Sequence, residues 1–192
     1  VQSRNIRKEI LERMAVKVIY IAGVPASGKS SLMKLVRDNL FADSKEFKHG
    51  LCRGIESCDG KFKMLGVFDG SLFEGTDKLG MTVINDALQY IGALQAAGSK
   101  TVVFVEGDRL FNIRFLSKTH ALLLVIDANE AVLKWRHIER GDTQTETFLK
   151  SRRSKVENFI ARYKVRRIWN NTPKDQERIL SYILKTAREY VD

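Results

Sequence analysis

The stretch VKVIYIAGVPASGKSSL at positions 16–32 constrains this chain more than any other feature. Its first residues are apolar and largely β-branched, which predicts a buried strand that ends at Gly23. The loop that follows completes the spacing G-x-x-x-x-G-K-[ST]. Apolar residues at helical spacing in 31–41 then predict a helix that begins next to this loop.

Phosphate binding explains these residue types. Gly23 and Gly28 let the backbone wrap closely around a phosphate with its N–H groups pointing inward. Lys29 is expected to reach the β- and γ-phosphates, and Ser30 to hold Mg²⁺. An ordinary strand–turn–helix with turn glycines is the alternative, but it leaves the combined spacing unexplained. The expected nucleotide-binding residues are Gly23, Ala26, Ser27, Gly28, Lys29, Ser30 and Ser31.

Apolar patterns predict the rest of the fold. Further strands are expected at 62–68, 101–105, 121–126 and 165–169, and further helices at 81–97, 129–140, 148–163 and 174–190. This alternation predicts an α/β fold with three layers, a parallel five-stranded sheet and the architecture of a P-loop nucleoside kinase.

Three other segments complete this expectation. The charged, glycine-containing region 42–61 is expected to be a loop with a short strand near 51–55, and 6–14 to be a short amphipathic helix. No internal repeat or linker is visible, so residues 1–192 are expected to form a single P-loop kinase domain with a lid at about 136–155.

Acidic residues follow two of the expected strands. Asp69 follows 62–68 and Glu106 follows 101–105, and ligands gather at the carboxyl ends of parallel strands. Asp69 is a candidate base for an attacking hydroxyl, or else a helix cap or turn residue. Glu106 is a candidate carboxylate for steering Mg²⁺, and Arg109 for contacting a substrate phosphate; a surface ion pair is the alternative for both.

A lid is expected after the fourth strand. The helix at 129–140, the polar loop at 141–147 and the cation-rich helix at 148–163 together resemble a cover over a triphosphate. Arg136 and Arg140 lie four residues apart on one helical face, so they are candidates for contacting the transferring phosphoryl group. A solvated charged face is the alternative interpretation.

Composition bears on partners and location. The net charge of +10 favours a polyanionic partner such as nucleic acid over a merely basic solvated surface. The two cysteines, Cys52 and Cys58, do not form a zinc spacing with His49, which favours reduced thiols in the cytoplasm. No apolar run approaches the roughly 20 residues needed to span a bilayer, and the N-terminus is charged, so neither a membrane partner nor a signal peptide is expected.

The segments GVPASGKSS, FDGSLFEGTDKLGM, VEGDR and ETFLKSRRSKVENF resemble the bacteriophage P-loop kinases that phosphorylate 5-hydroxymethyluracil in DNA, the first step of thymine hypermodification. The resemblance covers most of 16–169. Its P-loop part is generic, whereas 69–81 and 146–158 are more specific. It implies transfer of the ATP γ-phosphate, with Mg²⁺, to the hydroxymethyl group of the base in DNA, and it implies the host cytoplasm as the location.

The resemblance also implies roles for residues around the acceptor. Asp69 would take the hydroxymethyl proton, with Asp77 as the alternative base on the substrate side. Arg152 and Arg153 would contact the DNA backbone. Because a deep pocket cannot reach a base inside a duplex, either base flipping or a preference for single strands is expected.

Other functions remain compatible with the same residues. These are a nucleoside monophosphate or small-metabolite kinase, a polynucleotide end kinase, and a non-enzymatic nucleic acid binder regulated by ATP. The guanine-reading motif Asn-Lys-x-Asp does not occur, which argues against GTP. A DNA substrate predicts steep loss of activity with salt, and a small acceptor predicts a mild response. The sequence predicts no oligomeric state.

Overall fold

A computed structural model describes residues 14–70, 74–141, 144–163 and 165–192. The helix expected at 6–14 therefore lies almost entirely outside the described residues. The strands are β1 (Val16–Gly23), β2 (Lys45–His49), β3 (Cys52–Glu56), β4 (Phe62–Leu65), β5 (Thr101–Glu106), β6 (Leu122–Asp127) and β7 (Arg167–Trp169). The helices are α2 (Lys29–Leu40), α3 (Ile84–Ala97), α4 (Ile113–Thr119), α5 (Glu130–Glu139), α6 (Glu146–Tyr163) and α7 (Pro173–Val191), with a 3₁₀ turn, η1, at Thr76–Lys78.

The seven strands form one sheet in the order β2-β3-β4-β5-β1-β6-β7. The five strands expected from the sequence are β4, β5, β1, β6 and β7, and they pair in parallel. The α/β fold is thus confirmed. The strand count of five was too low, because β2 and β3 add an antiparallel hairpin at the β4 edge.

Of this hairpin, only the short strand expected near 51–55 was predicted, and it corresponds to β3. The strand β2 and the pairing were missed because these segments do not show a clear apolar alternation. In β2 the only large apolar side chain is Phe47, which stacks on Tyr90 of α3 at 4.6 Å between ring centroids. In β3 a glycine occupies a core-facing position: a Cβ on Gly54 would lie 2.2 Å from the carbonyl oxygen of Met64. The strand β3 still contributes Cys52 and Ile55 to the two core clusters, and Phe47 of β2 packs against one of them.

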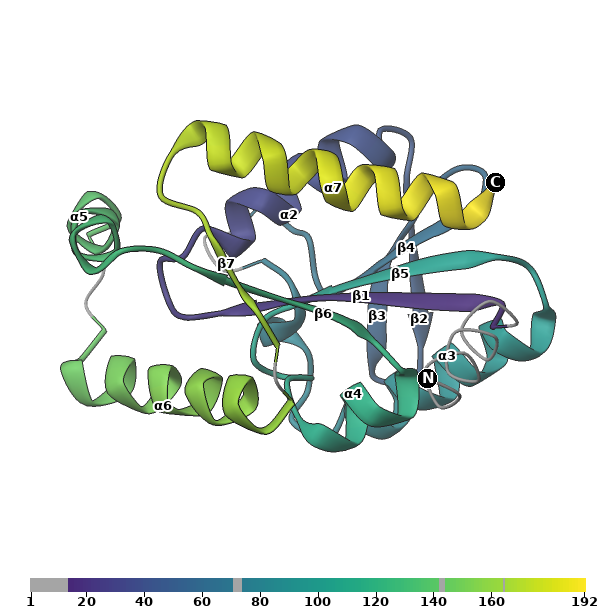
Figure 1. Ribbon diagram of the computed structural model, residues 1–192. Coiled ribbons are helices and arrows are strands. Elements are labelled where there is room, and N and C mark those ends of the chain that lie inside the picture. Colours follow the sequence, from purple (N-terminus) through teal and green to yellow (C-terminus); the bar gives the residue numbers. More distant parts are fainter. Residues whose placement is uncertain (1–13, 71–73, 142–143, 164) are drawn as a thin grey trace, which may run out of the picture.

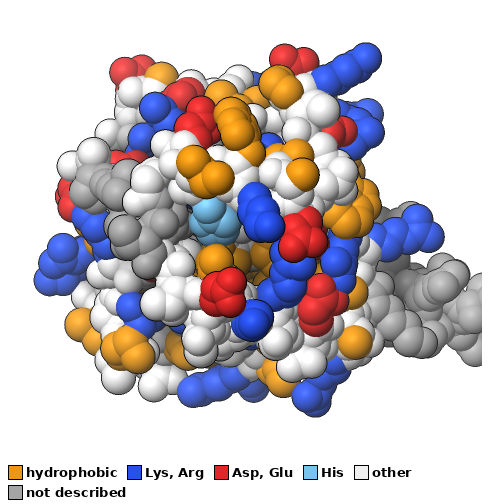
Figure 2. Space-filling model, turned by 90° about the vertical axis from the view of Figure 1, so that its left-hand side faces the viewer, with side chains coloured by type: hydrophobic (Ala, Val, Ile, Leu, Met, Phe, Trp, Pro, Cys, Tyr) orange, Lys and Arg blue, Asp and Glu red, His pale blue; other side chains and the backbone are white. Residues whose placement is uncertain are grey.

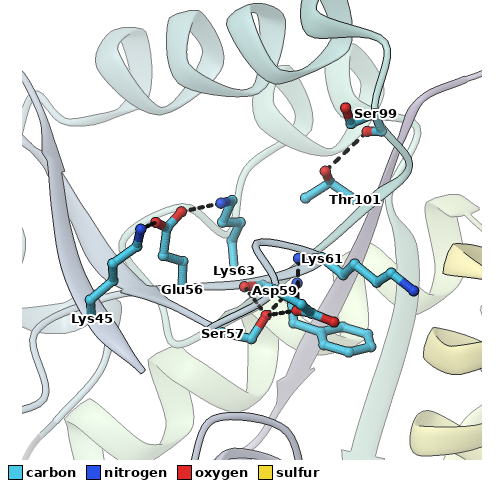
Figure 3. A network of polar contacts seen from close by, with 9 residues as sticks. Lys45, Glu56, Ser57, Asp59, Lys61, Lys63, Ser99 and Thr101 are labelled. Carbon is cyan, nitrogen blue, oxygen red and sulfur yellow. Dashed lines mark hydrogen bonds and ion pairs between the residues drawn. The ribbon is translucent and has the colours of Figure 1, made fainter. Parts of the chain in front are cut away.

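A charged network joins the hairpin to the sheet (Figure 3). Lys63 of β4 is buried and forms an ion pair with Glu56 of β3, which also pairs with Lys45 of β2 at 2.9 Å. Burial of Glu56 acts against the charged form, but hydrogen bonds from the two lysines outweigh it and lower the pKa of this carboxyl. Buried charges are tolerated when they are paired in this way.

Helices cover both faces of the sheet (Figure 1). On one face α2 and α7 pack over a cluster that includes Leu32, Phe104 and Ile183. On the other face α3, α4 and α6 pack over a cluster that includes Tyr20 and Phe115. This gives the expected three layers. None of the helices that the structure describes is long and apolar enough to cross a bilayer.

Helix boundaries follow local chemistry. Thr172 caps α7: its hydroxyl accepts from the amide of Asp175, whose carboxylate accepts from the amide of Thr172, and Pro173 follows at the first helical position. The helix α4 was not predicted, because it is only one to two turns long. Its start is nevertheless marked by Asn112, whose side chain accepts from the amide of Phe115 at 2.9 Å.

The topology places the candidate site at the carboxyl ends of β1 and β5. After β1 the chain enters α2 on one face, and after β5 it enters α4 on the opposite face, so the two loops diverge at this edge, where parallel sheets commonly bind ligands. The register pairs Glu106, the last residue of β5, with Ile21 of β1, so the carboxyl ends of both strands lie at the same edge of the sheet. In Figure 1 this edge lies on the left, next to α5.

Candidate functional site

The loop from Gly23 to Ser30 has the backbone conformations that its glycines permit. Gly23 has φ of 151°, and a Cβ there would lie 2.0 Å from the carbonyl oxygen of Ile126 on β6. Gly28 has φ of 93° and immediately precedes α2. Ala26 adopts φ of 60° without being glycine, which is a strained conformation found often at functional loops. Ser30 and Ser31 lie exposed in the first turn of α2.

Lys29 is held inside this loop. Its ammonium donates to the carbonyl oxygen of Val24 at 2.8 Å. Burial lowers the pKa of Lys29, and the negative charges of Glu106, Asp108 and Asp77 act in the opposite direction. The ammonium therefore lies where P-loop chemistry requires a cation, in a setting that three carboxylates influence.

Ser30 and Glu106 meet at the start of α2 and the end of β5. The Ser30 hydroxyl donates to Oε1 of Glu106 at 3.4 Å. Glu106 is 8% exposed, and burial, reinforced by Asp77, raises its pKa to about 7 in spite of Lys29, the Ser30 hydrogen bond and Arg140. A cation placed between these oxygens would favour the carboxylate, so the pair fits Mg²⁺.

Other metal ligands are sparse. In the part of the chain that the structure describes, no group of three or more His, Cys, Asp or Glu side chains could hold a metal ion. Mg²⁺ in phosphotransferases is commonly bound by one or two protein oxygens together with phosphates and waters. A hydroxyl and a carboxylate are therefore the donor set expected for such a metal, and no further protein cage is required.

Asp77 lies next to this pair. Its Oδ1 accepts from the backbone amides of Asp108 and Arg109 at 2.8 and 3.2 Å, and the Arg109 guanidinium donates to the Asp77 carbonyl at 3.0 Å. Thr76 donates to the carbonyl oxygen of Glu106. The turn η1 is thus joined to the end of β5, which brings the expected substrate residues Asp77 and Arg109 together.

Asp69 has different surroundings. Its side chain is 50% exposed, and both of its carboxylate oxygens accept from the ammonium of Lys78, at 2.7 and 2.6 Å. Asp77, in contrast, influences the pKa of both Lys29 and Glu106. The contacts therefore place Asp77 closer to the P-loop chemistry, while the choice of Asp69 as base stays a prediction.

Two arginines, one in α5 and one directly after it, approach the P-loop in different ways. Arg136 donates to the carbonyl oxygens of Ala26 and Asn170 at 3.3 and 2.9 Å. Burial lowers the pKa of Arg136, and the neighbouring charge of Arg140 lowers it further. Arg140 also acts on Lys29 and Glu106. The two arginines predicted for the phosphoryl group are thus brought to the P-loop.

The cations of α6 are partly neutralised. Arg152 forms an ion pair with Asp108, Lys155 pairs with the same carboxylate at 3.1 Å, and Arg152 lies 4.8 Å over the ring of Phe148. Arg153 lines a cavity of about 170 Å³ together with Val24, Pro25, Glu130, Leu133, Lys134, His137 and Leu149. The structure therefore places Arg152 and Arg153 at the P-loop edge; contact with DNA stays a prediction.

The lid expected at about 136–155 stays a prediction, but the part of α6 that follows it is packed into the domain. Val156 is buried against β1, and Phe159 stacks on Phe111 at 4.2 Å between ring centroids. The second half of α6 is therefore a packed part of the domain, whereas α5 and the first half of α6 lie over the P-loop edge. The connecting residues 142–143 lie outside the described residues.

Asn170 was missed by sequence reasoning. It is 1% exposed, and its side-chain amide donates to the carbonyl oxygen of Ser27 at 2.9 Å. In the sequence it precedes Asn171, Thr172 and Pro173, a run that is typical of a turn and a helix start. Such a run predicts only a turn, and it does not indicate that Asn170 contacts a loop 143 positions away in the sequence.

The parallel core, the G-x-x-x-x-G-K-[ST] loop and the Ser30–Glu106 pair define a P-loop phosphotransferase. The sequence matches the P-loop Nucleotide Kinase3 family over residues 14–174. This match covers most of the chain, so the protein belongs to that family. The comparison with curated proteins returned no match.

Proposed function

We propose that this kinase transfers the γ-phosphate of ATP to the hydroxymethyl group of 5-hydroxymethyluracil in DNA. The observation that carries the phosphotransfer is the meeting of Lys29, Ser30, Glu106 and Asp77 at the carboxyl ends of β1 and β5. The resemblance of four sequence segments to the bacteriophage enzymes and the net charge of +10 support DNA as the acceptor.

Each residue has a role in this proposal. Lys29 gives up its hydrogen bond to the Val24 carbonyl and binds the β- and γ-phosphates. Ser30 and Glu106 would hold Mg²⁺, which neutralises phosphate charge when bound. Arg140 approaches the same place from α5 and offsets charge on the phosphoryl group. Positioning and charge stabilisation account for most of the catalysis in phosphoryl transfer.

The base that accepts the hydroxymethyl proton is a carboxylate of the segment after β4. The contacts support Asp77, because two backbone amides hold its carboxylate in a fixed orientation beside Glu106. Asp69 is the second candidate, and its ion pair with Lys78 must open before it can accept a proton.

A kinase acting on a free nucleotide is the second candidate function. One observation favours it: Asp108 neutralises Arg152, which was expected to contact a DNA backbone, and also the neighbouring cation Lys155. Figure 2, which views the edge next to α5, shows Lys and Arg side chains mixed with Asp and Glu side chains on this face. Alternating charges suit a small acceptor better than a continuous basic track does.

The experiment is a transfer assay with γ-labelled ATP. The acceptors are DNA containing 5-hydroxymethyluracil, the same DNA with thymine and blocked ends, and free nucleotides, and labelled DNA is digested to nucleosides. Label on the modified base, lost in Lys29→Ala and reduced as salt rises, supports the proposal. Label on free nucleotides alone refutes it and selects the second candidate.

A further inference from the structure

Asn170 lies buried at the point where β7 meets the P-loop. Its backbone amide donates to the carbonyl oxygen of Asp127 at 2.8 Å, which fixes its position at the end of the sheet. Its side-chain amide donates to the carbonyl oxygen of Ser27, a residue with no exposed surface. Among the described residues the Asn170 Oδ1 has no hydrogen-bond partner. Burying an oxygen without a hydrogen-bond partner lowers the stability of the folded protein, so the position of the Asn170 side chain needs a reason beyond packing.

The geometry of a peptide plane supplies this reason. The carbonyl of Ser27 and the N–H of Gly28 belong to one planar trans peptide, so they point in opposite directions. When Asn170 holds the Ser27 carbonyl, it turns the Gly28 N–H away from itself. In a P-loop these N–H groups are the donors that cradle a phosphate.

Gly28 permits this contact. A Cβ at Gly28 would lie 2.5 Å from the side-chain nitrogen of Asn170, closer than nonbonded atoms approach, and the φ of 93° is also unfavourable for other residues. The glycine of the motif thus makes room for the Asn170 side chain on one side of the loop while its amide points to the other.

The neighbouring peptide is held in the same manner. Arg136 donates to the carbonyl oxygen of Ala26, the residue with the strained φ of 60°, and also to the carbonyl oxygen of Asn170. Two consecutive carbonyls of the loop are therefore fixed from outside by α5 and by the residue after β7. Strained loop conformations persist only when surrounding contacts determine them.

We propose that Asn170 is a positioning residue that presets the Ser27–Gly28 peptide for binding the phosphates of the nucleotide. The bond to Ser27 aligns the Gly28 amide before the nucleotide arrives, so less ordering is needed on binding. This inference rests on nucleotide binding by the P-loop and does not depend on the identity of the acceptor.

The test uses two substitutions and ADP as the probe, with binding measured by calorimetry at pH 8 and at pH 6. Asn170→Ser removes the reach to Ser27, and the loss of one such hydrogen bond predicts about tenfold weaker ADP binding at both pH values. Asn170→Asp places a carboxylate against the Ser27 carbonyl at pH 8. Burial beside a carbonyl oxygen raises the pKa of this carboxyl, so its protonated fraction grows toward pH 6. The protonated side chain donates again, and the affinity of the variant relative to the unaltered protein recovers.

The matched control is Asn171→Asp. The side-chain oxygen of Asn171 accepts from the backbone amide of Asn129 at 2.7 Å, and a carboxylate preserves that acceptor. This variant should bind ADP like the unaltered protein at both pH values. The pH-dependent recovery of Asn170→Asp is the readout that a loss of general stability does not reproduce.

Each result of this test either supports or overturns the inference about Asn170. ADP binding within twofold of the unaltered protein at pH 8, in a folded Asn170→Ser variant, overturns the inference. If Asn170→Asp does not fold, as judged by circular dichroism, Asn170→Ser decides alone. Weak ADP binding by Asn170→Ser with intact transfer to any acceptor at saturating ATP supports the inference, whichever acceptor the assay above selects.

Discussion

Replacing Glu106 by glutamine should change the pH dependence of stability. Burial raises the pKa of this carboxyl from its ordinary 4.5 to about 7 in the folded protein. Between these values the folded state binds more protons than the unfolded state, so the free energy of unfolding falls as the pH rises. A difference of about 2.5 pKa units at 1.36 kcal/mol each corresponds to about 3 kcal/mol.

Glutamine keeps the size of the side chain but stays neutral, so this loss disappears in Glu106→Gln. The free energy of unfolding of the variant minus that of the unaltered protein should be about 3 kcal/mol larger at pH 8 than at pH 4.5. This increase should develop mainly between pH 5 and 7. A bound Mg²⁺ favours the carboxylate, so Mg²⁺ with ADP at pH 8 should stabilise the unaltered protein more than the variant.

The assay is urea unfolding at half-unit steps from pH 4.5 to pH 8.5 for both proteins, followed by circular dichroism. Glu177→Gln serves as control, because this glutamate is exposed on α7. Its substitution should leave the shape of the profile unchanged. A pH-independent difference between Glu106→Gln and the unaltered protein would refute the reasoning, as would a difference that vanishes toward pH 8.

Three further predictions test the site and the core. Asp77→Asn should lower kcat by about 100-fold or more in the transfer assay, and Asp69→Asn by less; the reverse ranking reassigns the base. Asp108→Asn removes the carboxylate that pairs with two cations of α6. The slope of the logarithm of oligonucleotide affinity against the logarithm of salt concentration, measured by fluorescence anisotropy, should therefore steepen by about 1 to 2. An unchanged slope argues against DNA contact there. Ile183→Ala removes a fully buried side chain and should cost about 2–5 kcal/mol in urea unfolding, whereas Tyr182→Ala, half-exposed on the same helix, should cost far less.

The sequence predicted the parallel core because buried central strands are apolar along their whole length. In β5 all six residues are buried, and such a run stands out from its neighbours. In β2 three of five residues are exposed and charged, so this edge strand resembles a loop. Its formation depends on pairing with β3 and on the contact of Phe47 with α3, which no local pattern encodes.

The same distinction holds for the site. The P-loop is contiguous, so its residues could be found from spacing alone, and Glu106 could be placed because it ends a strand beside β1. Asn170 could not be found, because an asparagine that caps a turn and one that reaches another loop have the same local sequence. Its role depends on how β7 lies against the P-loop, a tertiary contact.

The composition of the chain does not determine which of its charges are neutralised by neighbouring residues. A net charge of +10 counts cations but not their partners. On α6 two of these cations share the carboxylate of Asp108, which follows Glu106 by two residues and whose backbone amide binds Asp77. Asp108 therefore connects the basic helix to Asp77, a residue expected on the substrate side of the site. A polyanion that binds α6 must compete with this carboxylate, so acceptor binding and the position of the helix are expected to be coupled through one residue.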